Sequence, residues 1–247
     1  MPGLRRDQDA YGRAMLDHLE GTTKDVVMIE RDDGLITSDI AVEWYFSEYR
    51  KWRKDEKQAM RYVRGRVLDV GAGAGRHALH MQSKGHDVVA IDNSPLAVEV
   101  CRRRGVKDAR VVPFVEVSKK LGKFDTIVMF GNNFGLFGGR ERARWMLRRL
   151  KGLTSDDARI VAVSLDPYGS TVTPEHLEYH RLNKRRGRMP GQIRIRVRYV
   201  KLKTPWFDYL LVSPDEMRSL LDGTGWHLEH VIDSDDSPFY IGVIEKD

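Results

Sequence analysis

Three glycines at every second position, Gly71, Gly73 and Gly75, follow a short apolar run and precede a helical one. Glycine is required where a turn takes a positive φ, or where the backbone approaches a ligand too closely for a Cβ. The free amide groups and positive dipole end of the helix expected at 75–84 would point back at this loop. The pattern predicts a binding loop for a nucleotide-type cofactor.

Two acids accompany the glycines. Asp69 lies two residues before the first glycine, and Asp92 follows the apolar stretch 87–91. An acid at the end of a second strand can accept hydrogen bonds from both ribose hydroxyls. A dinucleotide site would have a small residue where this chain has Arg76, and the Asp69 carboxylate would repel a pyrophosphate but pair with an ammonium. The residues therefore favour S-adenosylmethionine over NAD.

Residues 65–166 resemble the core of the class I S-adenosylmethionine-dependent methyltransferases. The family pattern D-x-G-x-G-x-G after the first strand is matched by Asp69 and the three glycines. The acid that ends the second strand in the family is matched by Asp92, with Asn93 beside it. The resemblance implies that Asp69 binds the methionine ammonium and that Asp92 binds the ribose.

Further cofactor contacts follow from the same resemblance. The family acid that binds the adenine amino group is matched best by Glu116, and Val117 would offer its backbone amide to the ring. The strand expected at 124–130 ends where the reacting methyl group would lie. The cofactor-binding residues that the resemblance implies are Asp69, Gly71, Ala72, Gly73, Gly75, Arg76, Asp92, Asn93, Glu116, Val117, Phe130 and Gly131.

The acceptor side is less strongly marked. Methyl transfer from a sulfonium is an in-line displacement, so the protein must mainly hold the nucleophile about 3 to 3.5 Å from the methyl group. A general base helps only where the acceptor loses a proton early. The family places acceptor contacts after its fourth and fifth strands and in an inserted segment. The candidates there are Asn132, Asn133 and Arg198 for substrate binding, and Asp166, Tyr168, His176 and His180 for catalysis.

These candidates also have structural explanations. His176 and His180 are four residues apart, which places them on one face of a helix, where either could act as a base or be solvated. Two histidines need a third ligand to hold a metal ion, and none is marked, so no metal site is predicted. Asp166 and Tyr168 follow the fifth strand, where they would either face the active-site rim or stabilise a turn with Pro167.

Strands and helices alternate from residue 65 onward, which predicts an α/β fold with a doubly wound, mostly parallel seven-stranded sheet and an antiparallel last strand. Residues 1–63 are expected to form an N-terminal helical lid, with helices around 7–20 and 38–62. Residues 64–247 would form the methyltransferase domain, with a β-rich insertion at 167–212. The remaining expected elements are strands 66–70, 87–91, 109–115, 124–130, 159–165, 192–203, 206–212, 226–233 and 239–245, and helices 75–84, 95–104, 139–151 and 213–221.

Charge is unevenly distributed along the chain. The formal net charge is +6, yet residues 181–203 hold ten Lys or Arg and no acid, which leaves −4 for the remainder. Within this basic segment, residues 192–203 alternate apolar and basic side chains, as in a strand with one dry face. The arginine row could be a solvated edge, could gather an acidic small molecule, or could follow a nucleic-acid backbone.

Length and composition bear on the number of domains and on where the protein is expected in the cell. The chain has 247 residues, of which 41% are apolar, which suits one α/β domain with an elaboration. Its single cysteine, Cys101, is expected to be a packed thiol without a catalytic role. No apolar run is long enough for a membrane span and the N-terminus lacks the features of a signal peptide, so a cytoplasmic protein without a membrane partner is expected. The oligomeric state is not predicted.

The sequence as a whole favours one activity. We expect transfer of a methyl group from S-adenosyl-L-methionine to a small-molecule acceptor, with release of S-adenosyl-L-homocysteine. The basic segment would suit an acidic acceptor. One alternative is an RNA or protein methyltransferase that uses the basic segment 181–203. Another alternative is a module that binds S-adenosylmethionine without catalysis.

Overall fold

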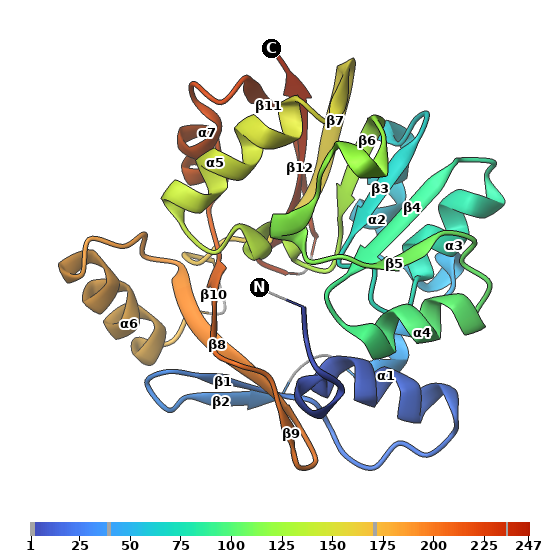
Figure 1. Cartoon of the computed structure of the whole chain (residues 1–247). Coiled ribbons are helices and arrows are strands. Elements are labelled where there is room, and N and C mark those ends of the chain that lie inside the picture. Colours follow the sequence, from blue (N-terminus) through green and yellow to red (C-terminus); the bar gives the residue numbers. More distant parts are fainter. Residues whose placement is uncertain (1–2, 39–40, 170–171, 236) are drawn as a thin grey trace. The chain divides into compact units, whose positions relative to one another are not determined.

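The computed structural model describes residues 3–38, 41–169, 172–235 and 237–247. Its largest sheet has seven strands in the order β11-β12-β7-β6-β3-β4-β5 (Figure 1). The pairs β3–β4, β4–β5 and β6–β7 are parallel, and β12 is antiparallel to β7. The predicted α/β class with a mostly parallel sheet is confirmed. The strands are β3 (Val67–Val70), β4 (Val88–Asp92), β5 (Ala109–Val111), β6 (Phe124–Met129), β7 (Thr154–Leu165), β11 (Trp226–Asp233) and β12 (Phe239–Lys246).

The chain divides into two compact units. The first unit comprises Met1–Trp52, Gly65–Leu121 and Arg194–Phe207, and it contains the three strands β3, β4 and β5. Each of the links between these strands passes through a helix, as expected for parallel neighbours. The helices of the unit are α1 (Ala10–Leu19), α3 (Arg76–Ser83) and α4 (Pro95–Arg103), with the 3-10 turns η1 (Arg6–Gln8), η2 (Val42–Phe46), η3 (Tyr49–Lys51), η5 (Phe114–Glu116) and η6 (Lys119–Leu121).

One buried carboxylate joins the two helices α1 and α4, which lie side by side (Figure 1). Asp9 accepts hydrogen bonds from the backbone N–H of Gly12 at the start of α1 and of Leu96 at the start of α4, each at 3.0 Å. The hydroxyl of Ser94 also donates to Asp9 at 2.7 Å, and Ser94 caps α4 by accepting from the Ala97 amide. Both helix dipoles therefore point their positive ends at one carboxylate.

Four strands of a five-stranded sheet belong to the first unit: β1 (Met28–Arg31), β2 (Ile36–Ser38), β9 (Leu202–Lys203) and most of β8 (Gln192–Tyr199). The hairpin of β1 and β2 pairs through β1 with β8, and β9 pairs with β8. This hairpin was not predicted from the sequence, because β8, the strand with which it pairs, lies more than 150 residues further along the chain. The predicted continuous strand 192–203 is wrong, since Val200 takes a positive φ of 52° and turns the chain back on itself.

The predicted helix 38–62 is also wrong. In its place the described residues form the short turns η2 and η3, the six-residue helix α2 (Lys54–Ala59) and the turn η4 (Met60–Tyr62). The aromatic side chains of these turns contact different parts of the unit: Tyr45 packs against Tyr11, Tyr49 against Trp52, and Trp44 against Arg76. The helix expected at 7–20 is confirmed as α1. Residues 1–2 and 39–40 of the predicted lid lie outside the described residues.

The second unit comprises Arg53–Arg64, Gly122–Ile193 and Asp208–Asp247. Helices α5 and α7 pack against each other, and the indole N–H of Trp226 on β11 donates to the Leu147 carbonyl of α5 at 2.9 Å. Of the predicted insertion 167–212, residues 170–171 are not described, and the remainder contains a helix as well as strands. The elements not yet given are η7 (Asn133–Phe137), α5 (Arg140–Lys151), α6 (Pro174–Arg185), β10 (Phe207–Leu210) and α7 (Pro214–Leu221).

Helix α6 lies within the segment predicted as a β-rich insertion, and it contains His176 and His180, which the sequence analysis placed on one face of a helix. Thr173 and His176 form a reciprocal capping box at its start, and Pro174 occupies the first helical position. Strand β5 is shorter than predicted, because Pro113 follows it and has no N–H for the ladder. Among the described helices, none combines the length and the apolar character that crossing a bilayer would require.

Replacement of Asp9 by alanine should destabilise the protein by about 2 to 4 kcal/mol, because two helix ends lose their cap at once. The measurement is urea unfolding followed by circular dichroism. Asp7→Ala is the matched control, since Asp7 is exposed and bonded only to exposed Arg5, and its loss should cost less than about 0.5 kcal/mol. Equal losses for the two variants would contradict the assigned role of Asp9.

Candidate functional site

The loop between β3 and α3 has the backbone that its glycines predicted. Gly71, Gly73 and Gly75 have φ angles of 70°, 57° and 79°, which other residues adopt only with strain. A Cβ on Gly75 would lie 2.8 Å from the Val106 side chain and 3.0 Å from the Cys101 sulfur. The amide of Gly75 also donates to the carbonyl of Ala72 at 2.8 Å. The loop therefore has a fixed conformation in which its glycines leave the backbone accessible to a ligand.

Asp69 supplies the most unusual feature of this loop. The residue is 2% exposed on β3, and its Oδ2 atom has no hydrogen-bond partner among the described residues. Burial raises the pKa of this carboxyl to about 7, with a further contribution from Asp92, while Arg76 acts in the opposite direction. The unpartnered oxygen of this buried carboxylate can accept a hydrogen bond from a cation.

Asp92, at the end of β4, faces the same loop. One of its carboxylate oxygens accepts from the Gly73 amide at 3.0 Å, and the other accepts from the Ser94 amide at 2.9 Å. Burial raises the pKa of Asp92 to about 6, although these two hydrogen bonds oppose the shift and the charge of Asp9 adds to it. An ionised carboxylate offers about four acceptor positions, so Asp92 can still accept from hydroxyl groups of a ligand.

Arg76 begins α3 and joins the loop to the N-terminal segment. Its guanidinium lies over the rings of Trp44 and Trp52, 5.2 and 5.3 Å from their centroids, and donates to the Ser47 hydroxyl at 3.2 Å. Both indoles come from the segment expected to form the lid, so a cation–π contact links that segment to the glycine loop. The sequence identified Arg76 as a loop residue but gave no sign of its aromatic partners.

The adenine candidates have a less distinctive setting. The Glu116 side chain is exposed at the end of η5, and the Val117 side chain is buried. The Val117 amide, expected to meet a ring, donates to the Phe114 carbonyl at 3.2 Å. Asn93 accepts through its carbonyl from the Leu4 amide at 3.0 Å. The roles assigned to Glu116 and Val117 remain predictions.

The second unit contains most of the acceptor candidates. After β6, Phe130 is buried, and Gly131 and Asn132 both have positive φ angles, of 66° and 67°. The Tyr209 hydroxyl donates to the Asn132 carbonyl at 2.5 Å, and the Asn132 Oδ1 atom is buried without a hydrogen-bond partner in the described ranges. Asn133 follows at the start of η7. A strained polar turn with an unused acceptor is thus held at the carboxyl end of β6.

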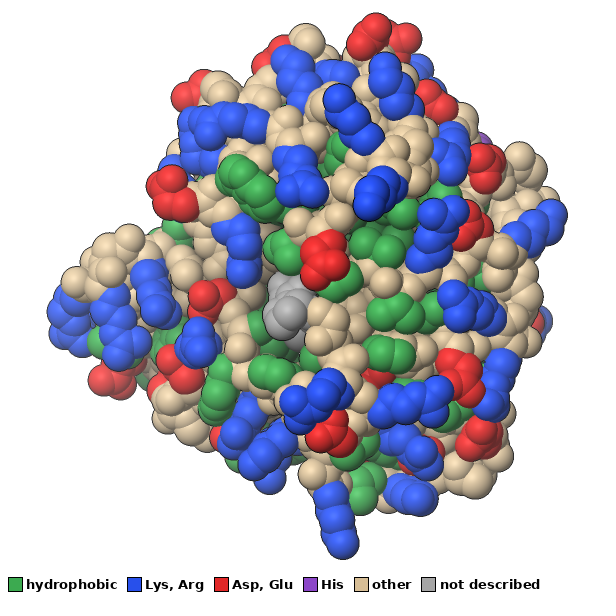
Figure 2. Space-filling view, in the orientation of Figure 1, with side chains coloured by type: hydrophobic (Ala, Val, Ile, Leu, Met, Phe, Trp, Pro, Cys, Tyr) green, Lys and Arg blue, Asp and Glu red, His purple; other side chains and the backbone are tan. Residues whose placement is uncertain are grey.

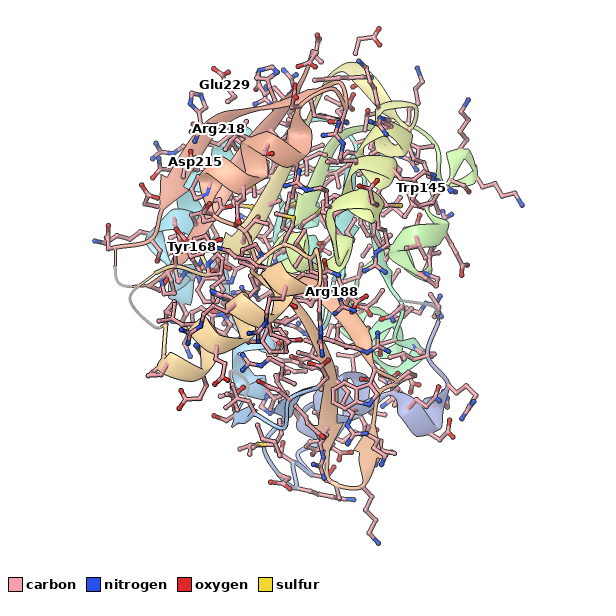
Figure 3. The ribbon with its side chains drawn as sticks, turned by 90° about the vertical axis from the view of Figure 1, so that its left-hand side faces the viewer. Trp145, Tyr168, Arg188, Asp215, Arg218 and Glu229 are labelled. Carbon is pink, nitrogen blue, oxygen red and sulfur yellow. The ribbon has the colours of Figure 1, made fainter. Side chains whose placement is uncertain are left out.

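The structure brings Tyr168 and His180 together, with ring centroids 5.7 Å apart. The Tyr168 amide donates to Asp166, and its hydroxyl donates to Glu216 of α7 at 2.8 Å. Figure 3 labels Tyr168 below Asp215 and Arg218, which flank Glu216 in the sequence. Burial, followed by the contact with Glu216, raises the pKa of Tyr168, which keeps its hydroxyl protonated. The contact between Tyr168 and Glu216 was not predicted from the sequence, because the two residues lie 48 positions apart along the chain.

His176 and His180 both lie on α6 but have different contacts. The His176 ring accepts from the Thr173 amide at 3.2 Å within the capping box, so it stabilises the start of α6. His180 is buried beside Tyr168. Of the two histidines predicted for catalysis, the capping contact gives His176 a structural role, whereas His180 lies within a polar cluster.

Arg198 has an acidic partner that the sequence did not reveal. Glu30 of β1 accepts two hydrogen bonds from Arg196, at 2.7 and 2.8 Å, and one from Arg198 at 3.3 Å. These contacts hold the pKa of Glu30 below its ordinary value despite some desolvation. Arg196 also lies over the Trp206 ring at 4.6 Å. The basic face of β8 is therefore partly neutralised from a neighbouring strand.

Comparisons with known proteins agree with this geometry. A family model described as a methyltransferase domain matches residues 67–156. Glycine/sarcosine N-methyltransferase of Halorhodospira halochloris is 26% identical over 103 residues, a match that spans 39% of this chain and only 38% of that protein.

Solved structures extend the similarity over the whole chain. A SAM-dependent methyltransferase from Bacteroides fragilis, in complex with S-adenosyl-L-homocysteine, has a TM-score of 0.82 and 29% identity, and the alignment covers 98% of this chain and 97% of that one. The CcbJ methyltransferase from Streptomyces caelestis shares the fold, with a TM-score of 0.60 and 12% identity over 82% of this chain and 97% of that one. Together with the acids and glycines of the β3–α3 loop, these similarities show that the chain belongs to the class I S-adenosylmethionine-dependent methyltransferases.

Proposed function

We propose that this protein transfers the methyl group of S-adenosylmethionine to a small-molecule acceptor and releases S-adenosylhomocysteine. The observation that carries the proposal is the pair of carboxylates at the glycine loop: Asp69 is buried and has an unpartnered oxygen, and Asp92 is half-buried. The two carboxylates fit the cofactor, because Asp69 can accept hydrogen bonds from an amino acid ammonium and Asp92 can accept them from a ribose diol. When bound, S-adenosylmethionine supplies a methyl group that its sulfonium has already activated.

The residues of the chain then have mainly positioning roles. Asp69 accepts a hydrogen bond from the ammonium of the cofactor, and the positive charge of the ammonium stabilises the ionised form of the carboxylate. Asp92 accepts from the ribose hydroxyls while the amides of Gly73 and Ser94 hold its carboxylate in one orientation. Gly71 and Gly73 let the backbone approach the ligand. Because alignment accounts for most of the barrier reduction in such a displacement, rigid binding is the main catalytic requirement.

A small-molecule acceptor fits the charge distribution better than a polyanion does. Glu30 neutralises part of the arginine row on β8, which removes the continuous cationic strip that a nucleic-acid backbone would follow. The curated relative is named for methylation of glycine and sarcosine, which are small amines. Tyr168 and His180 are the catalytic candidates that the fold brings together, and we propose that they orient the acceptor or receive its proton.

Calorimetry should detect micromolar binding of S-adenosylmethionine and S-adenosylhomocysteine and no binding of NAD. Asp92→Ala should weaken binding of S-adenosylhomocysteine by about 1 to 3 kcal/mol, because hydrogen bonds from the ribose to a carboxylate are lost. Asp87→Ala is the matched control at the opposite end of β4, where the exposed carboxylate bonds to Arg66. Unchanged affinity in the Asp92 variant would refute the ribose assignment.

Binding should also depend on pH. With a pKa of about 7, Asp69 is largely protonated below neutral pH in the free protein, and an ammonium ligand must displace that proton. Affinity for S-adenosylhomocysteine should therefore fall by more than about tenfold between pH 7.5 and pH 5.5, with proton release measurable by calorimetry in two buffers. Asp69→Asn should bind weakly at both pH values and lose most of this dependence. Equal affinity of the parent protein at the two pH values would contradict the role of Asp69.

A nucleic-acid acceptor is tested separately. We expect no binding of a single-stranded RNA 20-mer at physiological salt, measured by fluorescence anisotropy. Salt-sensitive binding that disappears when Arg194, Arg196 and Arg198 are all changed to Gln would instead support the RNA methyltransferase alternative.

A further inference from the structure

The last turn of α6 and the connection from α6 to β8, residues 183–191, hold two buried polar atoms without hydrogen-bond partners among the described residues. The helix ends in a left-handed turn at Gly187, with a φ of 70°, and the Arg188 amide donates to the Asn183 carbonyl at 2.9 Å. The Gln192 amide donates to the Met189 carbonyl at 3.0 Å. These bonds fix the connection in one conformation. Figure 3 labels Arg188 beside this part of the chain.

The position of the connection is set by Gly191. Its carbonyl accepts from the Leu211 amide at 2.9 Å, and a Cβ on Gly191 would collide with the Leu211 carbonyl and meet Pro167 at 3.1 Å. Pro167 follows the end of β7, so the connection lies beside the carboxyl end of a central strand of the sheet. In doubly wound α/β folds this is the edge at which ligands bind.

Asn183 contributes the first unsatisfied atom. The residue is fully buried, and its side-chain NH₂ group donates to the carbonyls of Pro190 and Gln192 at 2.9 and 2.7 Å. Because both partners are acceptors, the amide orientation is determined, and Oδ1 must point away from them. In the part of the chain that the structure describes, this buried Oδ1 has no hydrogen-bond partner.

Arg188 contributes the second unsatisfied atom. Its Nη1 atom is buried, and no described residue accepts a hydrogen bond from it. A buried donor without an acceptor costs free energy, and more so when it is charged. Other charges of the basic segment differ from it. Arg196 and Arg198 are bound by Glu30, and Arg185 of α6 is exposed. Lys and Arg side chains are spread widely over the face of the molecule drawn in Figure 2.

We infer that Arg188 binds a carboxylate of the methyl acceptor, and that Asn183 Oδ1 accepts a hydrogen bond from an N–H or O–H group of the same molecule. This inference rests on the proposed function, and it names the substrate class as small carboxylates that also carry a hydrogen-bond donor. A planar guanidinium matches a carboxylate in size and charge, and burial strengthens the interaction. The rigid connection would hold both groups at fixed positions beside the end of β7.

The test follows the Arg188 side-chain Nε–H resonance by NMR, with and without saturating S-adenosylhomocysteine. The probes are glycolate, β-alanine and anthranilate, each compared with its neutral amide. At least one carboxylate should shift the resonance in a saturable way, while its amide should not. If no carboxylate moves the resonance, or if the amides move it equally, the inference is wrong. Calorimetry on the same samples reports cofactor binding, so failure of the proposed function is seen independently.

Variants separate ligand binding from a structural role. Arg188→Gln should weaken binding of the effective carboxylate by about tenfold or more, since a charge-assisted hydrogen bond is lost. Arg185→Gln removes the same charge from an exposed position and should change binding less than about twofold. Because Arg188 Nη1 has no partner to lose, the thermal midpoint of Arg188→Gln should stay within about 2 °C of the parent. A larger drop without loss of carboxylate binding would assign Arg188 a structural role instead.

Discussion

Burial of carboxylates beside a glycine loop is the constraint on which the rest of this structure depends. Asp9 is fully buried but is satisfied by two helix N-termini and the Ser94 hydroxyl, so it holds α1 against α4. Asp69 and Asp92 lie close to the same loop and are less well compensated, which raises their pKa values to about 7 and 6. The free protein thus stores an electrostatic cost that a cationic ligand with hydroxyl groups removes.

The N-terminal segment owes its position to the same loop. Arg76 begins α3, lowers the pKa of Asp69 through its charge, and lies over the indoles of Trp44 and Trp52. A residue that a dinucleotide fold would have kept small therefore serves both as a counter-charge and as an anchor for residues 42–52. Irregular backbone is sufficient there, because aromatic contacts with the arginine, rather than helical periodicity, determine where the segment packs.

Charge pairing also narrows the choice of acceptor. The basic segment 181–203 has no acid of its own, yet Glu30 binds both Arg196 and Arg198 from a strand distant in sequence. Most of the other basic side chains of this segment are exposed, whereas the Nη1 atom of Arg188 is buried on a rigid connection and has no hydrogen-bond partner among the described residues. A half-buried guanidinium with one unpartnered nitrogen suits one carboxylate on a small molecule, whereas a polyanion is bound by a row of accessible charges.

The sequence by itself determined the alternation of strands and helices, the glycine loop and the acids at Asp69 and Asp92, because these features depend on neighbouring residues and local backbone preference. It failed for the 28–38 hairpin, which pairs with the distant strand β8, and for the turn at Val200. It also failed for the segment 38–62, whose tryptophan side chains pack against Arg76. Only the tertiary structure decided which charges are neutralised: Glu30 binds its arginines, Tyr168 donates to Glu216, and no described residue accepts a hydrogen bond from Arg188 Nη1. Each outcome depends on how segments far apart along the chain pack together.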